Sequence, residues 1–310
     1  VGRDAANQGV DVLLAPGLNT KRSSLCGRSF EYYSEDPYLS GKLAAGFIRG
    51  AQKQGVSACA KHYAANAQEL LRMHSDSVMD ERTLREMYLT NFEIAIKEGK
   101  PGFVMTAYNR VNGVYANESR HLLGDILRGE WGFDGAVVTD WGGSNSIVEG
   151  VREGMNLEMP AAGDDSPCQL VKAVKDGTID EKIVDERVDQ LLDFVLAEHK
   201  SGESSFDAAK QHQAAEAAAE KCLVLLKNDE HLLPLKKDAR VAVIGEFAAR
   251  SRYQGAGSSM VNAAQVDDTL PMLDEFFPAR VGFAQGFERL DAANDALADE
   301  AVQLAKAADC

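Results

Sequence analysis

Four short apolar runs alternate with helical stretches in the first half of the chain, and polar residues follow each run at once. The runs span residues 10–15, 56–60, 103–106 and 136–139, with a weaker fifth at 156–159. Strands separated by helices predict βαβ units and a parallel sheet. The run at 136–139 is apolar and β-branched, which is typical of a strand buried on both faces. It stops at Asp140, so we expect this carboxylate where the strand ends.

Three helices are predicted between these strands. The first begins with the acids of Ser34-Glu35-Asp36-Pro37 and ends at Gly55. The second starts at Asp80, repeats its apolar residues every 3.6 positions and ends at Gly99. The third runs from about Glu118 to Trp131. Four or five strands are too few for a barrel of eight, so we expect the N-terminal part of such a barrel to be missing here.

The second half of the chain changes character. A charged amphipathic helix is predicted at 179–198, a linker at Ser201-Gly202-Glu203-Ser204-Ser205 and an alanine-rich helix at 207–221. A new strand at 241–245 and a helix near 291–308 predict a second αβ region, and the chain stops where a further strand is expected. We therefore predict a partial barrel domain at 1–198, a linker and connecting helix at 199–221, and a partial α/β domain at 222–310.

Composition excludes several classes of protein. The 310 residues are 45% hydrophobic and 26% charged, which is ordinary for a globular protein. A net charge of −15 argues against a nucleic-acid partner. The sequence contains no apolar run of about 18 residues, so no membrane span is predicted. Five scattered cysteines without CxxC spacing predict reduced thiols and a cytoplasmic protein. The six histidines lack metal-ligand spacing, so we expect no metal and no cofactor.

Five segments, taken together and in this order, resemble glycoside hydrolase family 3 in its β-glucosidase-like branch. They are an arginine loop at 25–37, a Lys-His motif at 61–69, a tyrosine segment at 104–113, a nucleophile strand at 131–141 and a domain entry at 222–235. The resemblance implies a (β/α)8 TIM-like barrel followed by the start of an α/β sandwich. It also implies a retaining, exo-acting β-glycosidase, foremost a β-glucosidase that releases terminal non-reducing β-D-glucosyl residues.

Retention requires two carboxyl groups about 5–5.5 Å apart. The resemblance implies that Asp140 is the nucleophile, although an aspartate at this position could simply cap a turn. It implies sugar contacts for further residues: Arg28, Lys61, His62, Arg72, Tyr108, Trp141 and Ser258. Tyr108 would lie beside the nucleophile, and Trp141 would form an apolar wall for the C–H face of the sugar. Each of these residues also has a structural interpretation, as a salt-bridge partner, a core aromatic or part of an exposed loop.

The general acid is the part of the reaction that the sequence does not supply. Glu31, Glu69 and Glu158 are local candidates, but the resemblance implies a glutamate beyond residue 310. The N-acetylglucosaminidase branch uses a Gly-His pattern that residues 64–69 lack, and His74-Ser75-Asp76 is out of place for it. Ala67 stands where relatives usually have asparagine, which predicts a looser loop around Arg72.

Several interpretations of function stay open at this point. A non-catalytic carbohydrate-binding relative, a β-xylosidase and an N-acetylhexosaminidase are the alternatives to a β-glucosidase. The expected partner is a β-linked oligosaccharide or glucoside, and a homo-oligomer is compatible with the sequence. Neither nucleic acid nor a membrane is expected as a partner.

Overall fold

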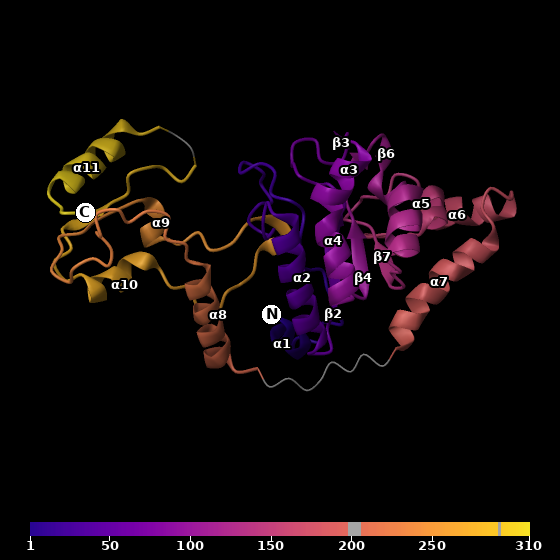
Figure 1. Ribbon diagram of the computed structural model, residues 1–310, viewed down its shortest axis with the longest axis horizontal. Coiled ribbons are helices and arrows are strands. Elements are labelled where there is room, and N and C mark those ends of the chain that lie inside the picture. The colour runs from indigo at the N-terminus through magenta and orange to yellow at the C-terminus, as the bar shows by residue number, and fades with distance from the viewer. Residues whose placement is uncertain (198–205, 291–292) are drawn as a thin grey trace. The chain divides into compact units, whose positions relative to one another are not determined.

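The computed structural model describes residues 1–197, 206–290 and 293–310 (Figure 1). The chain divides into two compact units, Val1–Gln211 and His212–Cys310, and each is described by itself. The predicted linker at 201–205 lies outside the described residues, as does the predicted boundary at 198–199. Across the described ranges, no helix combines the length and the apolar character needed to cross a membrane.

A parallel sheet forms the centre of the first unit. Its strands are β1 (Val12–Leu13), β2 (Ser57–Tyr63), β4 (Phe103–Thr106) and β7 (Ala136–Val138), and they neighbour one another in chain order. All three pairings are parallel, with Cys59 opposite Phe103 and Phe103 opposite Ala136. The predicted parallel α/β sheet is therefore confirmed. The fifth run contributes a single bridge, between Val138 and Leu157, and the closed barrel stays a prediction.

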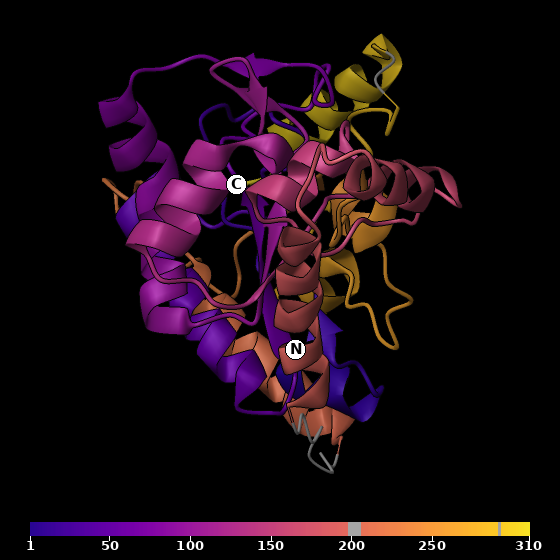
Figure 2. The ribbon, with the colours of Figure 1, turned by 90° about the vertical axis from the view of Figure 1, so that its right-hand side faces the viewer.

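Both faces of this sheet are buried. One face, with Ala58, Ala60, Val104 and Val137, belongs to a core cluster shared with the helices. The other face carries a second cluster, in which the ring of Phe103 packs edge-on against Phe194, 4.5 Å away between centroids. Phe194 belongs to α7 (Glu181–Leu196), which is turned toward the viewer in Figure 2. Burial on both sides explains why these strands are apolar without alternation.

The predicted helices of the first unit are present. The carboxylate of Asp36 accepts hydrogen bonds from the amides of Tyr38 and Leu39 and so caps α2, whose first residue is Pro37. The predicted helix after Asp80 consists of four consecutive segments, two of them π-helical. The helical elements are α1 (Gly2–Asn7), α2 (Pro37–Gln52), α3 (Glu81–Thr83), η1 (Leu84–Leu89), α4 (Thr90–Ile94), η2 (Ala95–Gly99), η3 (Ala116–Glu118), η4 (Arg120–Glu130), α5 (Ile147–Glu153), α6 (Asp165–Lys175) and α7.

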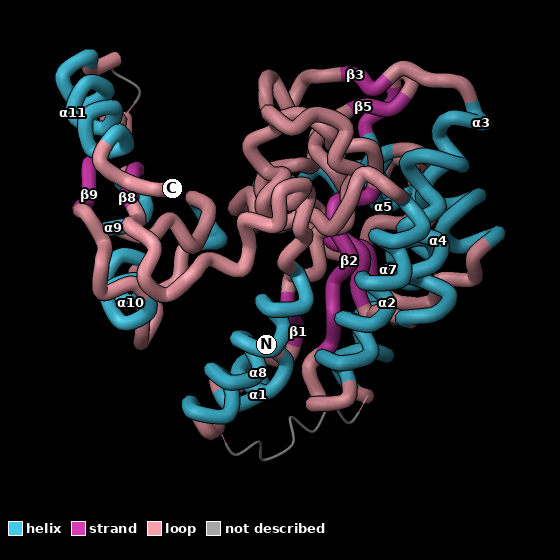
Figure 3. Tube along the Cα trace, turned by 60° about the vertical axis from the view of Figure 1, so that its left-hand side comes forward, coloured by secondary structure: helices cyan, strands magenta, loops and turns pink. Residues whose placement is uncertain are grey.

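A small second sheet, which the sequence analysis did not predict, follows the Lys-His motif. It consists of β3 (Asp76–Ser77), β5 (Arg110–Val111) and β6 (Val114–Tyr115). Strands β5 and β6 form a hairpin around Asn112-Gly113, with φ angles of 51° and 91°. This dipeptide is favoured in two-residue hairpin turns because both positions need positive φ. The loops that follow the central strands gather at the same end of the unit (Figure 3).

The second unit contains a two-stranded parallel sheet of β8 (Ala242–Ile244) and β9 (Gly282–Ala284). The prediction of a strand at 241–245 is confirmed, and so is that of a helix near 291–308, although residues 291–292 are not described. Its helical elements are α8 (Ala208–Cys222), which begins in the first unit, α9 (Glu246–Ala249), η5 (Gly257–Ser259), α10 (Thr269–Phe276) and α11 (Asp295–Lys306).

Candidate active site

The ends of two strands bring a carboxylate and two basic side chains together. Asp140 follows the last residues of β7, and Lys61 and His62 lie near the end of β2. Neighbouring residues of a regular strand point to opposite faces. The pairing of β2 with β4 shifts its register between Lys61 and Tyr63, and the side chains of Lys61 and His62 both enter one polar cluster.

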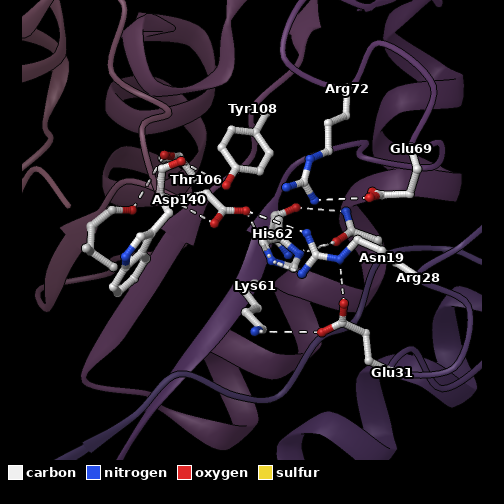
Figure 4. A network of polar contacts seen from close by, with 12 residues as sticks. Asn19, Arg28, Glu31, Lys61, His62, Glu69, Arg72, Thr106, Tyr108 and Asp140 are labelled. Carbon is white, nitrogen blue, oxygen red and sulfur yellow. Dashed lines mark hydrogen bonds and ion pairs between the residues drawn. The ribbon is translucent and has the colours of Figure 1, made fainter. Parts of the chain in front are cut away.

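The two carboxylate oxygens of Asp140 have different surroundings (Figure 4). Oδ1 accepts a hydrogen bond of 2.7 Å from the backbone amide of Trp141. Oδ2 lies 3.4 Å from Nε2 of His62 and 3.6 Å from Nη1 of Arg28. Oδ2 is buried and accepts no hydrogen bond from any residue that the structure describes. One oxygen is thus fixed by the backbone, and the other is available to a ligand.

Glu31 links the two basic residues of the site that sequence motifs identify separately. One of its oxygens accepts a hydrogen bond from Nε of Arg28, and the other lies 3.7 Å from Nζ of Lys61. The three side chains are between 13% and 18% exposed, so water screens this interaction only in part. Burial disfavours the charge of Arg28, but the hydrogen bond to Glu31, together with the electrostatic effects of Tyr32, Glu31 and Asp140, outweighs it and raises the pKa of Arg28. Glu31 therefore holds both cations near the nucleophile.

His62 is the most deeply buried residue of the cluster, with 1% of its side chain exposed. Burial, followed by the charges of Arg28, Lys61 and Arg72, lowers its pKa well below the ordinary value. The imidazole is therefore neutral at neutral pH, and its contact with Asp140 is no ion pair.

A second chain of contacts reaches Asp140 from the loop after the Lys-His motif. Nη1 of Arg72 lies 3.0 Å from Oε2 of Glu69, and the guanidinium stacks 4.6 Å from the centroid of the Tyr108 ring. The Tyr108 hydroxyl donates a 2.9 Å hydrogen bond to the carbonyl of Trp141. Burial and then the charge of Asp140 raise the pKa of Tyr108 to about 12, so this hydroxyl keeps its proton.

Most of the residues predicted for the site lie in this one network: Arg28, Lys61, His62, Arg72, Tyr108, Trp141 and Asp140. Trp141 is 45% exposed, as a residue that stacks on a ligand must be. Ser258 is exposed in η5 of the second unit, and its contact with a sugar stays a prediction. Arg72 contacts Glu69 and Tyr108, and the looser loop expected from Ala67 stays a prediction.

The local candidates for the general acid have different surroundings. Glu31 and Glu69 are engaged in ion pairs with cations of the site, whereas Glu158 is half-buried next to the bridge at Leu157. Of the motif that suggested another branch, His74 is exposed, and Asp76 accepts a hydrogen bond from Gly113 in the small sheet.

Sequence reasoning missed two residues that hold His62, namely Asn19 and Tyr32. Asn19 is 2% exposed and contacts both the backbone and the ring of His62, and the hydroxyl of Tyr32 lies 3.2 Å from Nδ1. The sequence does contain a signal for Asn19, which is the first polar side chain after β1 and follows Pro16-Gly17-Leu18 directly. Tyr32 lies four residues after Arg28 in the loop that already carried a predicted site residue.

Comparison with known proteins identifies the family of the chain. Residues 1–194 match the model of the glycosyl hydrolase family 3 N terminal domain, and residues 223–310 match that of the C-terminal domain. The thermostable beta-glucosidase B of Acetivibrio thermocellus is 44% identical, over 99% of this chain and 41% of the relative. An exo-alpha-(1->6)-L-arabinopyranosidase of Bifidobacterium longum is 40% identical, over the whole chain and 42% of the relative.

A solved structure gives the same assignment. The GH3 beta-glucosidase of Bifidobacterium adolescentis aligns with a TM-score of 0.90 at 40% identity, over 99% of this chain and 46% of that one. The chain spans about two fifths of the length of the curated relatives it matches. Because the two family models together match most of its residues, the chain belongs to glycosyl hydrolase family 3.

Proposed function

We propose that the full-length protein containing this chain is a retaining β-glucosidase that removes terminal non-reducing β-D-glucosyl residues from oligosaccharides or glucosides. The observation that carries the proposal is the asymmetry of Asp140. Its Oδ1 is fixed by the amide of Trp141, while its buried Oδ2 accepts no hydrogen bond within the described part of the chain and faces Arg28. The names of two similar proteins, both beta-glucosidases, support the choice of substrate.

In the proposed reaction, Oδ2 of Asp140 attacks the anomeric carbon of the sugar and forms a covalent glycosyl ester. The bond from that carbon to the leaving oxygen breaks, and a glutamate beyond residue 310 donates a proton to this oxygen. The same glutamate then takes a proton from water, which displaces Asp140 and restores the β configuration. The reaction belongs at the carboxyl ends of the strands of a (β/α)8 barrel, which is part of the proposal.

Charged donors would recognise the sugar hydroxyls. Hydrogen bonds from charged groups are stronger than those between neutral groups. Arg28, Lys61 and Arg72 are cations within one network, and the side chain of Trp141 is exposed beside the nucleophile. We assign these residues to the sugar that occupies the site, with Ser258 of the second unit as a further contact.

The stereochemistry of the first product tests this proposal. The full-length protein is mixed with aryl β-D-glucoside and the anomeric protons are followed by NMR. β-Glucose must appear first and mutarotate later, and an initial α-anomer would refute retention. Turnover must disappear in Asp140→Asn. Failure to hydrolyse any glycoside would instead support a carbohydrate-binding relative without activity.

A panel of sugars resolves the specificity. β-Xyloside, N-acetyl-β-glucosaminide and α-L-arabinopyranoside are assayed beside β-glucoside, the last because of the arabinopyranosidase relative. The proposal requires the highest kcat/KM for β-glucoside. A higher value for another sugar would keep the reaction type and replace the substrate.

We also propose a cytoplasmic location. All five cysteines are free thiols in the structure. Three of them are exposed: Cys168, Cys222 and Cys310. Exposed free thiols are typical of a reducing compartment. Fractionation of the source cells with an antibody against the protein tests this, and recovery outside the cytoplasm would contradict it.

A further inference from the structure

The side-chain amide of Asn19 forms two hydrogen bonds with the backbone of His62. Oδ1 of Asn19 accepts a hydrogen bond of 2.7 Å from the His62 amide, and Nδ2 donates one of 2.8 Å to the His62 carbonyl. A backbone amide can only donate and a carbonyl can only accept. These two contacts therefore fix which end of the Asn19 amide is oxygen, an assignment that geometry alone often leaves open.

The oxygen of Asn19 in turn fixes the proton on the imidazole ring. Nδ1 of His62 lies 3.3 Å from Oδ1 of Asn19, which can only accept. On the other side of the ring, Nε2 lies 2.7 Å from Nη2 of Arg28, which can only donate. A proton on Nδ1 and a lone pair on Nε2 satisfy both neighbours. The opposite tautomer would place two acceptors together at Nδ1 and two donors together at Nε2.

We infer that Asn19 is a positioning residue that holds His62 as its Nδ1–H tautomer, so that the unprotonated Nε2 holds Arg28 beside Asp140. Tyr32, whose hydroxyl lies 3.2 Å from Nδ1, can donate or accept and follows the tautomer rather than setting it. The meaning of this arrangement for catalysis rests on the proposed function. The tautomer itself is a property of the protein that is measured without turnover.

The inference explains the state of the nucleophile. Nε2 of His62 presents its lone pair near Oδ2 of Asp140 at 3.4 Å, and two acceptors form no hydrogen bond. His62 thus leaves Oδ2 unbound while it fixes Nη2 of Arg28, whose Nη1 lies 3.6 Å from the same oxygen. Asn19 thus orients His62, and His62 orients Arg28. Together they determine the position of the Arg28 guanidinium relative to Oδ2 of Asp140.

Nitrogen NMR reads the tautomer directly. The full-length protein is labelled with ¹⁵N-histidine, two-bond ¹H–¹⁵N correlations are recorded at neutral pH, and His62→Gln identifies the His62 signals. The inference requires a protonated, pyrrole-type Nδ1 and a pyridine-type Nε2. A protonated Nε2, alone or together with Nδ1, would overturn it whatever reaction the protein catalyses.

Variants then assign the tautomer to Asn19. Asn19→Leu, similar in size but without an acceptor, must raise the population of the Nε2–H form relative to wild type and lower kcat/KM by about 10- to 100-fold, as for outer partners of metal-binding histidines. Tyr32→Phe must keep the Nδ1–H form. A tautomer that changes in Tyr32→Phe and not in Asn19→Leu would overturn the role of Asn19.

A matched control separates this effect from general loss of stability. Asn91 is also fully buried and donates to the carbonyl of Leu18, next to Asn19, but among the described residues its side chain forms hydrogen bonds with Leu18 and Phe92 and not with His62. Asn91→Leu must keep the Nδ1–H form even where its Tm falls as far as that of Asn19→Leu. If Asn19→Leu does not fold, the spectra of wild type and Tyr32→Phe still decide the inference.

Discussion

Arg28 and Asp140 face each other in the first unit, with Nη1 of Arg28 3.6 Å from Oδ2 of Asp140. No hydrogen bond joins them, and the guanidinium is held instead by Glu31 at Nε and by His62 at Nη2. The cation thus stays near the nucleophile without occupying the oxygen that must react. The contacts that hold Arg28 in place are therefore separate from the oxygen of Asp140 that reacts.

Glu31→Gln tests the carboxylate that links the two cations. The amide keeps the size of the side chain but removes the charge shared by Arg28 and Lys61, which we expect to lower kcat/KM by about 10- to 100-fold, or roughly 1.4–2.8 kcal/mol. Glu35→Gln in the same loop is the control, because Glu35 is exposed. Equal kinetics for both variants and wild type would remove Glu31 from the site.

Lys61→Met tests the binding of the sugar. Loss of a charged donor is expected to lower kcat/KM by two orders of magnitude or more, on the order of 3 kcal/mol, with little change in Tm. Lys53→Met is the control, since Lys53 is exposed at the end of α2. A variant at Lys61 with normal kinetics and a lowered Tm would show that the residue is structural.

Tyr108→Phe tests the hydrogen bond from the Tyr108 hydroxyl to the Trp141 carbonyl. The variant loses the hydrogen bond to the Trp141 carbonyl, worth about 0.5–1.5 kcal/mol, and we expect kcat to fall roughly 10-fold or less. Tyr115→Phe is matched to it, because Arg110 stacks on Tyr115 at 5.0 Å as Arg72 stacks on Tyr108. The prediction fails where the two variants have the same kcat.

The pH dependence of stability reports on His62. Its pKa in the folded protein lies well below 6.5, so the unfolded chain takes up a proton first as the pH falls. The stability contributed by the neutral imidazole is therefore complete above about pH 6.5 and is lost below it, by at most about 1.4 kcal/mol per pH unit.

His62→Gln supplies the reference for this prediction, because it removes only that titration. The difference in Tm between wild type and His62→Gln must shift against wild type as the pH is lowered from 7 towards 5. A difference that is constant over this range, or that shifts in favour of wild type, would show that His62 is not held neutral.

The strands were predictable because burial leaves a local record in the sequence. β4 and β7 are apolar on both faces, and their residues appear as unbroken apolar runs. The small sheet was not predicted, since its strands have two residues each and are too short for any period. Its Asn112-Gly113 turn was nonetheless a readable signal.

The site was predictable where a functional residue follows a strand, and less so where a loop supplies its partner. Asp140, Lys61 and His62 stand at strand ends, which meet at one edge of a parallel sheet. The contacts of Asn19 with His62 join residues 43 positions apart. No period or motif records that distance, so the holding contacts emerge only from the fold.

Covalent trapping is the strongest test of Asp140 as the nucleophile. The full-length protein is incubated with an activated 2-deoxy-2-fluoro-β-glucoside, which forms the glycosyl-enzyme faster than water can remove it, and its peptides are analysed by mass spectrometry. One added fluoroglucosyl group is expected on Asp140, and none in Asp140→Asn. A label on Glu31, Glu69 or Glu158, or undiminished turnover by Asp140→Asn, would contradict this role of Asp140.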